Sequence, residues 1–483
     1  MDPVSPERRR LLPSSSLVNN ASKRKYKPFN CFNNYCKELK SRSLNLTSIL
    51  LLIYILPIRV SCSLFEIFFT NFSRNPYNQC GSIESGKIIA FPVVGLMVGN
   101  SIFLLAPFCG WLSDTKIGRG NAIYLGLWLG WIGTLIQAIG CCLQYHSCGT
   151  TTALIGRYVF FGIAFVLMLV SLSLIISNIL PYGIDQLMNE SSVKIRAFIH
   201  WFSLCFYGGF ALSVISDELV ISVVAFALFS FSLCLHFLFK HRFEHIPIPN
   251  PYKIVFKVLK FTLKSSRTRR QHRSAFTYWG EEPSRMDLAK ERYGGCFSHE
   301  EVENVKTFLR ITVVLVTFSP LFISTVTFLN SSMFAAQFKD GYEDLKGNAE
   351  TVIWVLGKFS SFFIIVPLFE LVILPLFPKL EYFITNPLKG LGLANILIIL
   401  SIISLFLIDL IGRISDDISN MPCFFIWEPV TKTIDISYWI LVIPSVLAGT
   451  SHFLTWIYSF EFLCSQSPFG MHGMVIGLFW FLH

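Results

Sequence analysis

The charged residues most able to do chemistry lie within and between long apolar runs of the sequence. Arg59 falls near the middle of the first run, where a charge is costly and marks a functional candidate. The alternative is that its side chain reaches up to a membrane surface. Between the second and third runs, Gly110–Gly120 (GWLSDTKIGRG) places Asp114, Lys116 and Arg119 in one short link. Charges of both signs at this spacing can pair with one another, so the link could form an ion-pair cluster. The alternative is an ordinary basic loop between two spans.

No recognisable catalytic pattern accompanies these charges. The sequence contains no nucleophile elbow, phosphate-binding loop or zinc motif, and its 13 cysteines include no C-x-x-C pair. His241 and His245 have an i,i+4 spacing that suits a metal ion, but no third ligand accompanies them. We therefore expect neither an enzyme nor a metal site, and no cofactor.

The apolar runs identify the class of protein. The chain has 483 residues, of which 53% are hydrophobic and only 14% are charged, and its mean hydropathy is +0.56. Several runs exceed about 18 residues, the length that crosses a bilayer as a helix. The predicted fold class is therefore an all-α polytopic membrane protein. The net charge of +10 comes from basic residues beside the spans, which topology and anionic membrane lipid explain better than nucleic-acid binding.

The positions of the runs divide the chain into four parts. Residues 1–43 are rich in Ser, Asn and basic residues and are predicted to form a disordered cytosolic tail. Residues 44–240 are predicted to form an N-terminal six-helix bundle, in which Pro57 should kink the first helix. Residues 241–307 are predicted to be a cytosolic linker with a basic amphipathic helix. Residues 308–483 are predicted to form an incomplete C-terminal helical bundle, because the chain ends within an eleventh span.

The tail carries a short sorting pattern. Glu7 is followed four and five positions later by Leu11 and Leu12, which is similar to the dileucine signal that clathrin adaptors bind. Such a signal would send a multi-pass membrane protein to endosomes and lysosomes, with the plasma membrane as the alternative location. The pattern is short, and a chance match is the competing explanation.

Two further features concern the loops predicted to be lumenal. Asn71 opens the glycosylation sequon Asn-Phe-Ser at the edge of the first span. Cys80 and Cys148 fall in two loops on the same side of the membrane and could form a disulfide in an oxidising lumen. Cys423 is a competing partner, and unpaired thiols are the other alternative.

Five motifs, in order along nearly the whole chain, resemble the proton-coupled oligopeptide transporter family of the major facilitator superfamily. They are Gly110–Gly120, Asn178–Gln186 (NILPYGIDQ), Tyr293–Arg310 (YGGCFSHEEVENVKTFLR), Asn386–Leu391 (NPLKGL) and Phe460–Met471 (FEFLCSQSPFGM). The peptide/histidine transporter branch is the nearest look-alike. The resemblance implies a major facilitator fold, in which two six-helix bundles rock around a central cavity. It also implies that protons drive the uptake of di- and tripeptides or of histidine.

In that family the motif between spans 2 and 3 forms a charge cluster that latches one state of the transporter. By resemblance, the members of this gating motif here are Gly110, Asp114, Lys116, Gly118 and Arg119. Glycines allow the close turn, and the basic residues would hold the link on the cytosolic side.

Several of the positions that bind substrate and protons in the family carry different chemistry here. Arg59 corresponds to the arginine of the helix 1 Glu-x-x-Glu-Arg motif, but the two glutamates become Ile55 and Ile58. The helix 4 lysine becomes Ile176, and the helix 5 asparagine becomes Tyr207. Both glutamates proposed for proton coupling are therefore missing from the first span.

The later spans continue this departure. The helix 10 glutamate, which takes the peptide amino terminus in the family, becomes His452, and span 8 carries Lys358 where the look-alike branch tends to have an acid. With Arg59, these residues make the predicted cavity net basic. The ammonium group of an ordinary dipeptide would lack an anion there, at a cost of several kcal/mol. His452 could titrate near lumenal pH as a substitute proton site, or it could merely hydrogen-bond a neighbouring helix.

We therefore predict a secondary active transporter, a proton symporter for small peptides, histidine or a related solute. The candidates for substrate and proton binding are Arg59, Asn178, Tyr207, Lys358, His452 and Glu461. The alternative function is a transport-silent endolysosomal scaffold or sensor, which the lost coupling residues, the tail and the long linker favour.

Overall fold

The described part of the chain is built from helices. The computed structural model describes residues 28–74, 103–146, 151–211, 218–245, 252–265, 284–315, 323–324, 361–377, 386–415, 437–468 and 470–482. Every element named in these ranges is an α-, 3₁₀- or π-helix, and one isolated bridge joins Lys290 to Phe297. Six helices in these ranges are long and apolar enough to cross a membrane, as the composition predicts.

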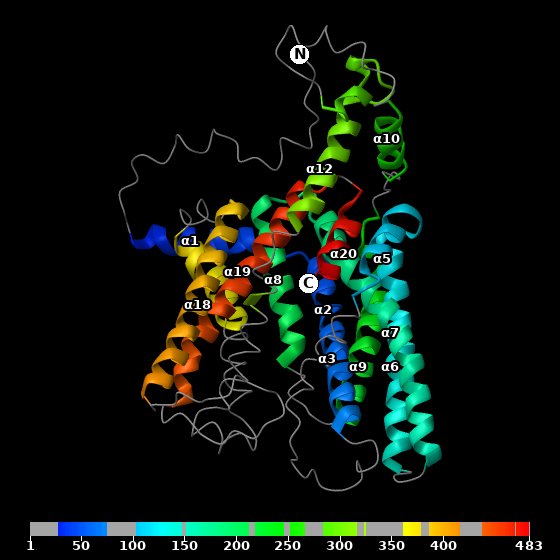
Figure 1. The fold of residues 1–483 in the computed structure, drawn as a ribbon, viewed down its shortest axis with the longest axis vertical. Helices are drawn as coiled ribbons and strands as arrows, with labels where there is room; N and C mark the ends of the chain where they lie inside the picture. The colour runs from blue at the N-terminus through cyan, green and yellow to red at the C-terminus, as the bar shows by residue number, and fades with distance from the viewer. Residues whose placement is uncertain are drawn as a thin grey trace.

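The N-terminal half supplies helices that the apolar runs predict. They are α2 (Leu46–Ile53), α3 (Leu56–Arg74), α5 (Ala106–Leu112), η2 (Ser113–Ile117), α6 (Arg119–His146), α7 (Thr151–Gln186), α8 (Ser192–Ala211) and α9 (Glu218–Phe239). The first run breaks at Tyr54 and Ile55, directly before Pro57, because a proline removes a helical hydrogen bond. Figure 1 shows α6 and α7 side by side along one flank of the molecule.

The linker and the C-terminal half complete the bundle. Their elements are η4 (Lys240–Arg242), α10 (Tyr252–Ser265), η6 (Asp287–Ala289), η7 (Glu291–Tyr293), α12 (His299–Leu315), η10 (Ser361–Ile365), η11 (Leu368–Ile373), α16 (Leu374–Leu376), α18 (Pro387–Ser415), η13 (Tyr438–Leu441), α19 (Val442–Gln466) and α20 (His472–Leu482). Helices α18 and α19 pair on the flank opposite α6 and α7, and α10 and α12 project together from one end (Figure 1). We call this end, which the basic residues predict to be cytosolic, the cytosolic end.

A helix precedes the first span. Residues 28–42 form α1 (Pro28–Arg42), so this part of the predicted disordered tail is in fact helical. Helix α1 lies near the cytosolic end and contacts α8 of the first half and α16 of the second (Figure 1). The Tyr35 hydroxyl donates a hydrogen bond to the carbonyl oxygen of Leu371 at 2.8 Å. These contacts, which a sequence pattern does not reveal, give α1 a fixed place across both halves.

The linker motif Tyr293–Arg310 belongs to a compact ion-pair network before span 7. Lys290 and Lys306 each pair with Asp287 and with Glu303. Burial alone would raise the pKa of Asp287, but hydrogen bonds from the two lysines outweigh it and hold that pKa below its usual value. The network fixes the start of α12 to the preceding turn.

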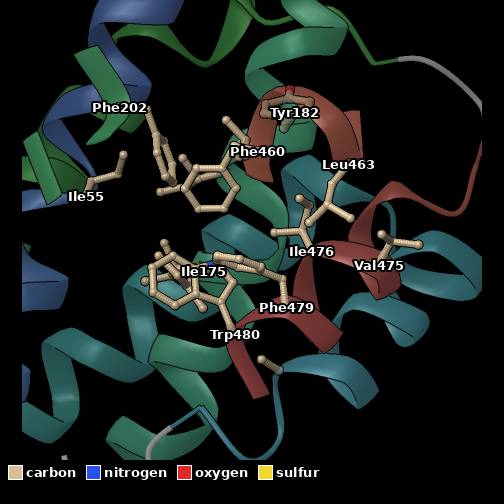
Figure 2. Close-up of a cluster of buried hydrophobic side chains, with 14 of the residues drawn as sticks. Ile55, Ile175, Tyr182, Phe202, Phe460, Leu463, Val475, Ile476, Phe479 and Trp480 are labelled. Carbon is tan, nitrogen blue, oxygen red and sulfur yellow. The ribbon is translucent and has the colours of Figure 1, made fainter. Parts of the chain in front are cut away.

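Aromatic side chains fill the place where the two halves meet. Phe202 and Phe206 of α8 face α19, with ring centroids 5.4 Å from Phe460 and 5.6 Å from Trp456, respectively. Trp480 of α20 lies 5.1 Å from Trp456, measured between ring centroids. Figure 2 shows Phe202, Phe460 and Trp480 converging from the three helices. The two halves are therefore in close contact toward the cytosolic end.

Candidate functional site

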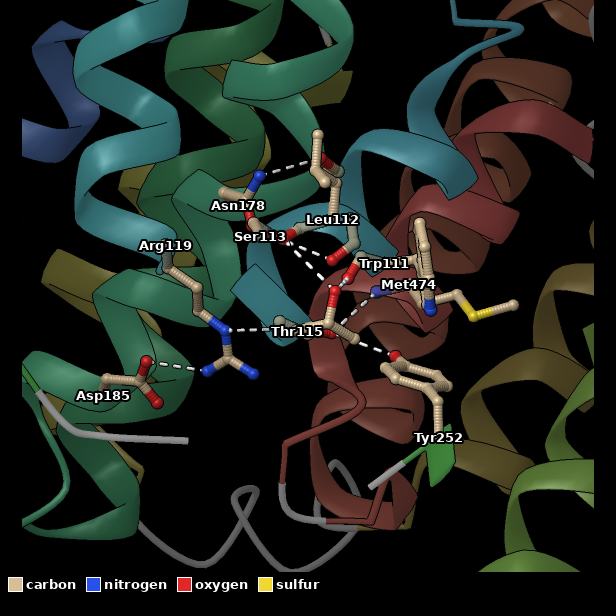
Figure 3. Close-up of polar contacts among 12 residues, drawn as sticks. Trp111, Leu112, Ser113, Thr115, Arg119, Asn178, Asp185, Tyr252 and Met474 are labelled. Atoms are coloured by element: carbon tan, nitrogen blue, oxygen red, sulfur yellow. Dashed lines mark hydrogen bonds and ion pairs between the residues drawn. The ribbon is translucent and has the colours of Figure 1, made fainter. Parts of the chain in front are cut away.

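The gating motif folds into a buried ion-pair cluster. Arg119 Nε lies 3.1 Å from Asp114 Oδ1, and Arg119 Nη1 lies 2.7 Å from Oδ2 of Asp185, near the end of α7. Asp114 is 2% exposed and Arg119 is 4% exposed. One guanidinium therefore lies between two carboxylates and joins η2, α6 and α7 (Figure 3).

Asp114 extends the cluster to the linker and to the second half. Its Oδ2 accepts hydrogen bonds from the Tyr252 hydroxyl of α10 and from the backbone N–H of Met474 in α20, each at 3.1 Å. The first N–H groups of a helix lack partners within it, and its dipole favours a carboxylate there. Burial and the Asp114 carboxylate raise the pKa of Tyr252, so its hydroxyl stays a neutral donor. We call Asp114, Arg119, Asp185, Tyr252 and Met474 the Asp114 latch.

Glycines allow the latch to close. Gly110 in α5 faces Gly473 in α20 so closely that a Cβ on Gly110 would lie 2.1 Å from the Gly473 carbonyl oxygen. Gly118 has a φ of 83°, which residues with a side chain rarely adopt, and it separates η2 from α6. Lys116 of the predicted motif is exposed, and within the described ranges it makes no ion pair.

Asn178, a predicted substrate candidate, lies beside the latch. Its side-chain oxygen accepts a hydrogen bond from the Ser113 hydroxyl of η2, and its amide nitrogen donates to the Leu174 carbonyl oxygen at 2.7 Å. Asn178 is fully buried. Its amide therefore ties α7 to the gating motif.

Three other predicted residues meet between the two halves, and we call them the central site. His452 of α19 is hydrogen-bonded through Nε2 to the Tyr207 hydroxyl of α8 and through Nδ1 to the Ser324 hydroxyl at 2.9 Å. Arg59 of α3 lies close by, with its Cζ 6.0 Å from the ring centroid of Phe206, the residue next to Tyr207. Each hydroxyl can donate or accept, so His452 has a partner at both nitrogens in either protonation state.

Glu461 of α19 joins the two halves at a position on the helix away from His452. Its Oε1 lies 2.8 Å from Nε of Arg196 in α8. Because Glu461 follows His452 by nine residues, the two side chains are about 13 Å apart along the axis of α19. Glu461 therefore contributes to the contact between the halves and does not belong to the central site.

Several predicted residues lie outside the described ranges. They are Glu7, Leu11, Leu12, Cys80, Cys148, Lys358 and Cys423. Asn71 falls within the last part of α3. The predicted contribution of Lys358 to a basic cavity, the disulfide and the sorting signal therefore stay predictions.

Sequence patterns do not single out a second buried cluster. Oε1 of Glu370 in η11 is hydrogen-bonded to Nδ1 of His200 in α8, and its Oε2 lies 3.4 Å from Nη1 of Arg42 at the end of α1. We call these three residues the Glu370 triad. One signal was available, because Glu370 is the only acid in the apolar run 352–377. Arg42 and His200 lie near the ends of spans, where polar residues are common.

The chemistry that these clusters allow is ion pairing and proton exchange. Within the described ranges no group of three or more His, Cys, Asp and Glu residues could hold a metal ion. Contacts between the halves in these ranges involve carboxylates, histidines, arginines and tyrosines.

No protein-family model matches the chain, but similar proteins are found among curated sequences and solved structures. Solute carrier family 15 member 5 of Homo sapiens is 25% identical over 313 residues, which cover 60% of this chain and 49% of that protein. The chain thus spans about half the length of the curated relative it matches. The in meso crystal structure of the POT family transporter PepTSo aligns with a TM-score of 0.53 and 16% identity, over 91% of this chain and 89% of that chain. A crystal structure of an auto-inhibited POT family peptide transporter aligns with a TM-score of 0.49 and 14% identity, over 90% and 86%.

These findings establish the fold and the class of protein. The chain has the major facilitator fold that its motifs predict, and it is a multi-pass membrane protein. The resemblance to the proton-coupled oligopeptide transporters is confirmed as a similarity of sequence and fold.

Proposed function

We propose that this chain is a member of the proton-coupled oligopeptide transporter family and moves a small peptide, histidine or a related solute by alternating access. The observation that carries this proposal is the central site. There, Arg59, Tyr207 and His452 come from three spans and both halves to one place between the bundles. Transporters built from two rocking halves bind substrate near the middle of the membrane, between the halves.

The charge of the central site defines the substrate class. Arg59 carries a permanent positive charge and would pair with a carboxylate of the substrate. His452 occupies the position where the family has the glutamate that takes the peptide amino terminus, so an ammonium group has lost this partner. The proposed substrates are therefore solutes with a carboxylate and little net positive charge, in preference to cationic dipeptides.

The proposed driving force is the proton gradient, with His452 as the proton site. An unperturbed histidine titrates near pH 6.5, so an acidic lumen would protonate it and neutral cytosol would release the proton. The two hydroxyl partners fit both states, since they can accept from a protonated ring and donate to a neutral one. No cofactor is needed for this cycle.

An uptake assay tests the function. Full-length protein with Leu11→Ala and Leu12→Ala would be held at the cell surface, and uptake of labelled histidine and of a labelled dipeptide would be followed under an inward proton gradient. We expect uptake to rise at acidic pH and to fall about tenfold or more in His452→Ala, the loss expected of an essential proton site. The matched control is His241→Ala, which changes an exposed histidine of η4.

The outcomes separate the two functions. Uptake that is equal in His452→Ala and in the parent would exclude His452 as the proton site. No uptake of either solute at any pH, with folded protein at the surface, would contradict transport of this substrate class and favour the transport-silent scaffold or sensor.

The proposed location is the membrane of endosomes and lysosomes, with a clathrin adaptor as the partner of Glu7, Leu11 and Leu12. Fluorescence microscopy of the tagged protein should show it in acidic compartments, and Leu11→Ala with Leu12→Ala should move it to the plasma membrane. The same distribution for both proteins would contradict the sorting signal.

A further inference from the structure

The Glu370 triad is a buried ionic centre with members from three different parts of the chain. Arg42 is 4% exposed, His200 is 2% exposed and Glu370 is 2% exposed. The two carboxylate oxygens of Glu370 are divided between the other two members, with Oε1 toward the imidazole and Oε2 toward the guanidinium. Charged groups this deeply buried are stable only when they are paired.

The location of the triad makes it sensitive to the arrangement of the halves. His200 belongs to α8 of the first half, whereas Glu370 belongs to η11 of the second. Arg42 ends α1, which contacts both halves near the cytosolic end. Any motion that moves η11 away from α8 therefore breaks the hydrogen bond between His200 and Glu370.

The proton of His200 decides the net charge of the triad. Arg42 is always charged and balances an ionised Glu370, so a neutral His200 leaves the triad neutral and a protonated one gives it a charge of plus one. A protonated imidazole attracts the carboxylate as an ion pair, whereas a neutral imidazole offers only a hydrogen bond. If the halves separate, a protonated His200 keeps its charge beside apolar surface without its carboxylate, which is costly.

Within the described ranges, few other charged groups lie on the elements that carry the triad. On α8, Arg196 precedes His200 by one turn and pairs with Glu461 of α19. On α1, Lys37 and Lys40 are exposed and Glu38 is half-buried, and the described part of span 8 adds no other charged residue. His200 is therefore the member of the triad that we expect to gain and lose a proton.

We propose that His200 and Glu370 form a proton-binding site whose occupancy holds the two halves together at the cytosolic end. The proton binds more tightly when the halves are in contact, because only then does the carboxylate lie beside the imidazole. By linkage, a bound proton favours contact to the same degree, and opening toward the cytosol releases the proton there. This inference rests on the proposed function, since it assigns a second proton site to the same transport cycle.

The experiment measures the contact between the halves without any substrate. Spectroscopic labels are attached through noncanonical amino acids at Asn121 and Lys389, which are exposed at the beginnings of α6 and α18 near the cytosolic end (Figure 1). Distances between the labels are recorded in lipid nanodiscs from about pH 5 to about pH 8, a range that spans the usual titration of histidine. We expect the ratio of closed to open molecules to rise about tenfold or more as the pH falls across this range.

The variants assign the response to the triad. His200→Gln and Glu370→Gln should each give a closed fraction that no longer depends on pH, whereas His200→Lys, with a permanent charge, should stay closed throughout. Arg42→Gln should keep the response and move its midpoint to higher pH by about one unit or more, because a repelling charge is gone. His241→Gln is the matched control and should behave like the parent.

The results distinguish this inference from the proposed function. A full pH response in His200→Gln, or none in the parent, would overturn the proton site while proton-driven uptake could still be observed. If His200→Gln does not fold, the absence or persistence of the response in Glu370→Gln decides the question. The protein could also show a pH response that depends on the triad but no uptake of either solute. That result would support the proton site and contradict only the proposed transport function.

Discussion

The Asp114 latch and the Glu370 triad join the same two halves with opposite arrangements of charge. In the latch, Arg119 lies between two carboxylates, Asp114 and Asp185. In the triad, the Glu370 carboxylate lies between two basic groups, a guanidinium and an imidazole. The cation of the latch is an arginine, which keeps its charge, whereas one basic group of the triad is a histidine, which we propose as a proton-binding group.

This difference separates two tasks at the cytosolic end. The latch joins α20 to the gating motif, and the triad joins η11 to α8. His245 and His472 lie near the latch, but in the described part of the chain neither is hydrogen-bonded to Asp114 or Asp185. We therefore expect the latch to set how stable the closed end is and the triad to set how that stability varies with pH.

Replacing Asp114 by Asn should have the largest effect. The Asp114 carboxylate is bonded to Arg119, Tyr252 and Met474, and a hydrogen bond to a charged group contributes about 1.5–3 kcal/mol. The closed fraction measured with labels at Asn121 and Lys389 should therefore fall at every pH, while its relative change with pH persists. Asp185→Asn is the control and should cost less, since it leaves the bonds of Asp114 to Tyr252 of α10 and to Met474 of α20 in place. Loss of the pH response in Asp114→Asn would show that the two clusters do not act separately.

Replacing Gly110 by Ala should have the next largest effect. The new methyl group would overlap the Gly473 backbone, and overpacking of this kind costs about 1–3 kcal/mol. The same distance measurement should show a smaller closed fraction, again at all pH values. Gly162→Ala in α7 is the matched control, because a Cβ there has no neighbour within 4 Å. Equal effects of the two alanines would mean that the contact between α5 and α20 does not control closure.

Replacing Tyr252 by Phe should have the smallest effect. It removes one hydrogen bond to the Asp114 carboxylate, worth about 1.5 kcal/mol, and leaves the ion pair with Arg119 intact. A modest decrease in the closed fraction, with an unchanged pH midpoint, is expected from the labels. A decrease as large as that of Asp114→Asn would mean that the linker helix α10, and not the ion pair, holds the latch.

The sequence predicted the spans and the grouping of Asp114 with Arg119, because both depend on local patterns. Apolar runs of sufficient length define spans in any membrane protein, and Asp114 and Arg119 are five residues apart in one motif. The central site was predicted by alignment with the family, which placed Arg59, Tyr207 and His452 at corresponding depths of different spans. The structure brings these three together.

The Glu370 triad could not be predicted in the same way. Its members are separated by 158 and 170 residues, from Arg42 to His200 and from His200 to Glu370. Only the packing of α1, α8 and η11 brings them together, and no periodicity encodes that packing. Asn178 was also a candidate for substrate binding, and the structure places its amide beside the latch, where it accepts a hydrogen bond from Ser113.

The backbones of α5 and α20 touch where the two helices cross. Gly110 meets Gly473 with no side chain between the backbones, and a Cβ on Gly477, one turn later, would lie 2.4 Å from the Ala106 carbonyl oxygen. Side chains can change rotamer to absorb a collision, but two touching backbones cannot be compressed. In the proposed rocking cycle, we therefore expect the closed halves to stop where these two backbones meet. Substitutions that weaken the Asp114 latch or the Glu370 triad should therefore change the fraction of molecules that are closed at the cytosolic end. They should not change the distance between the halves in the closed molecules.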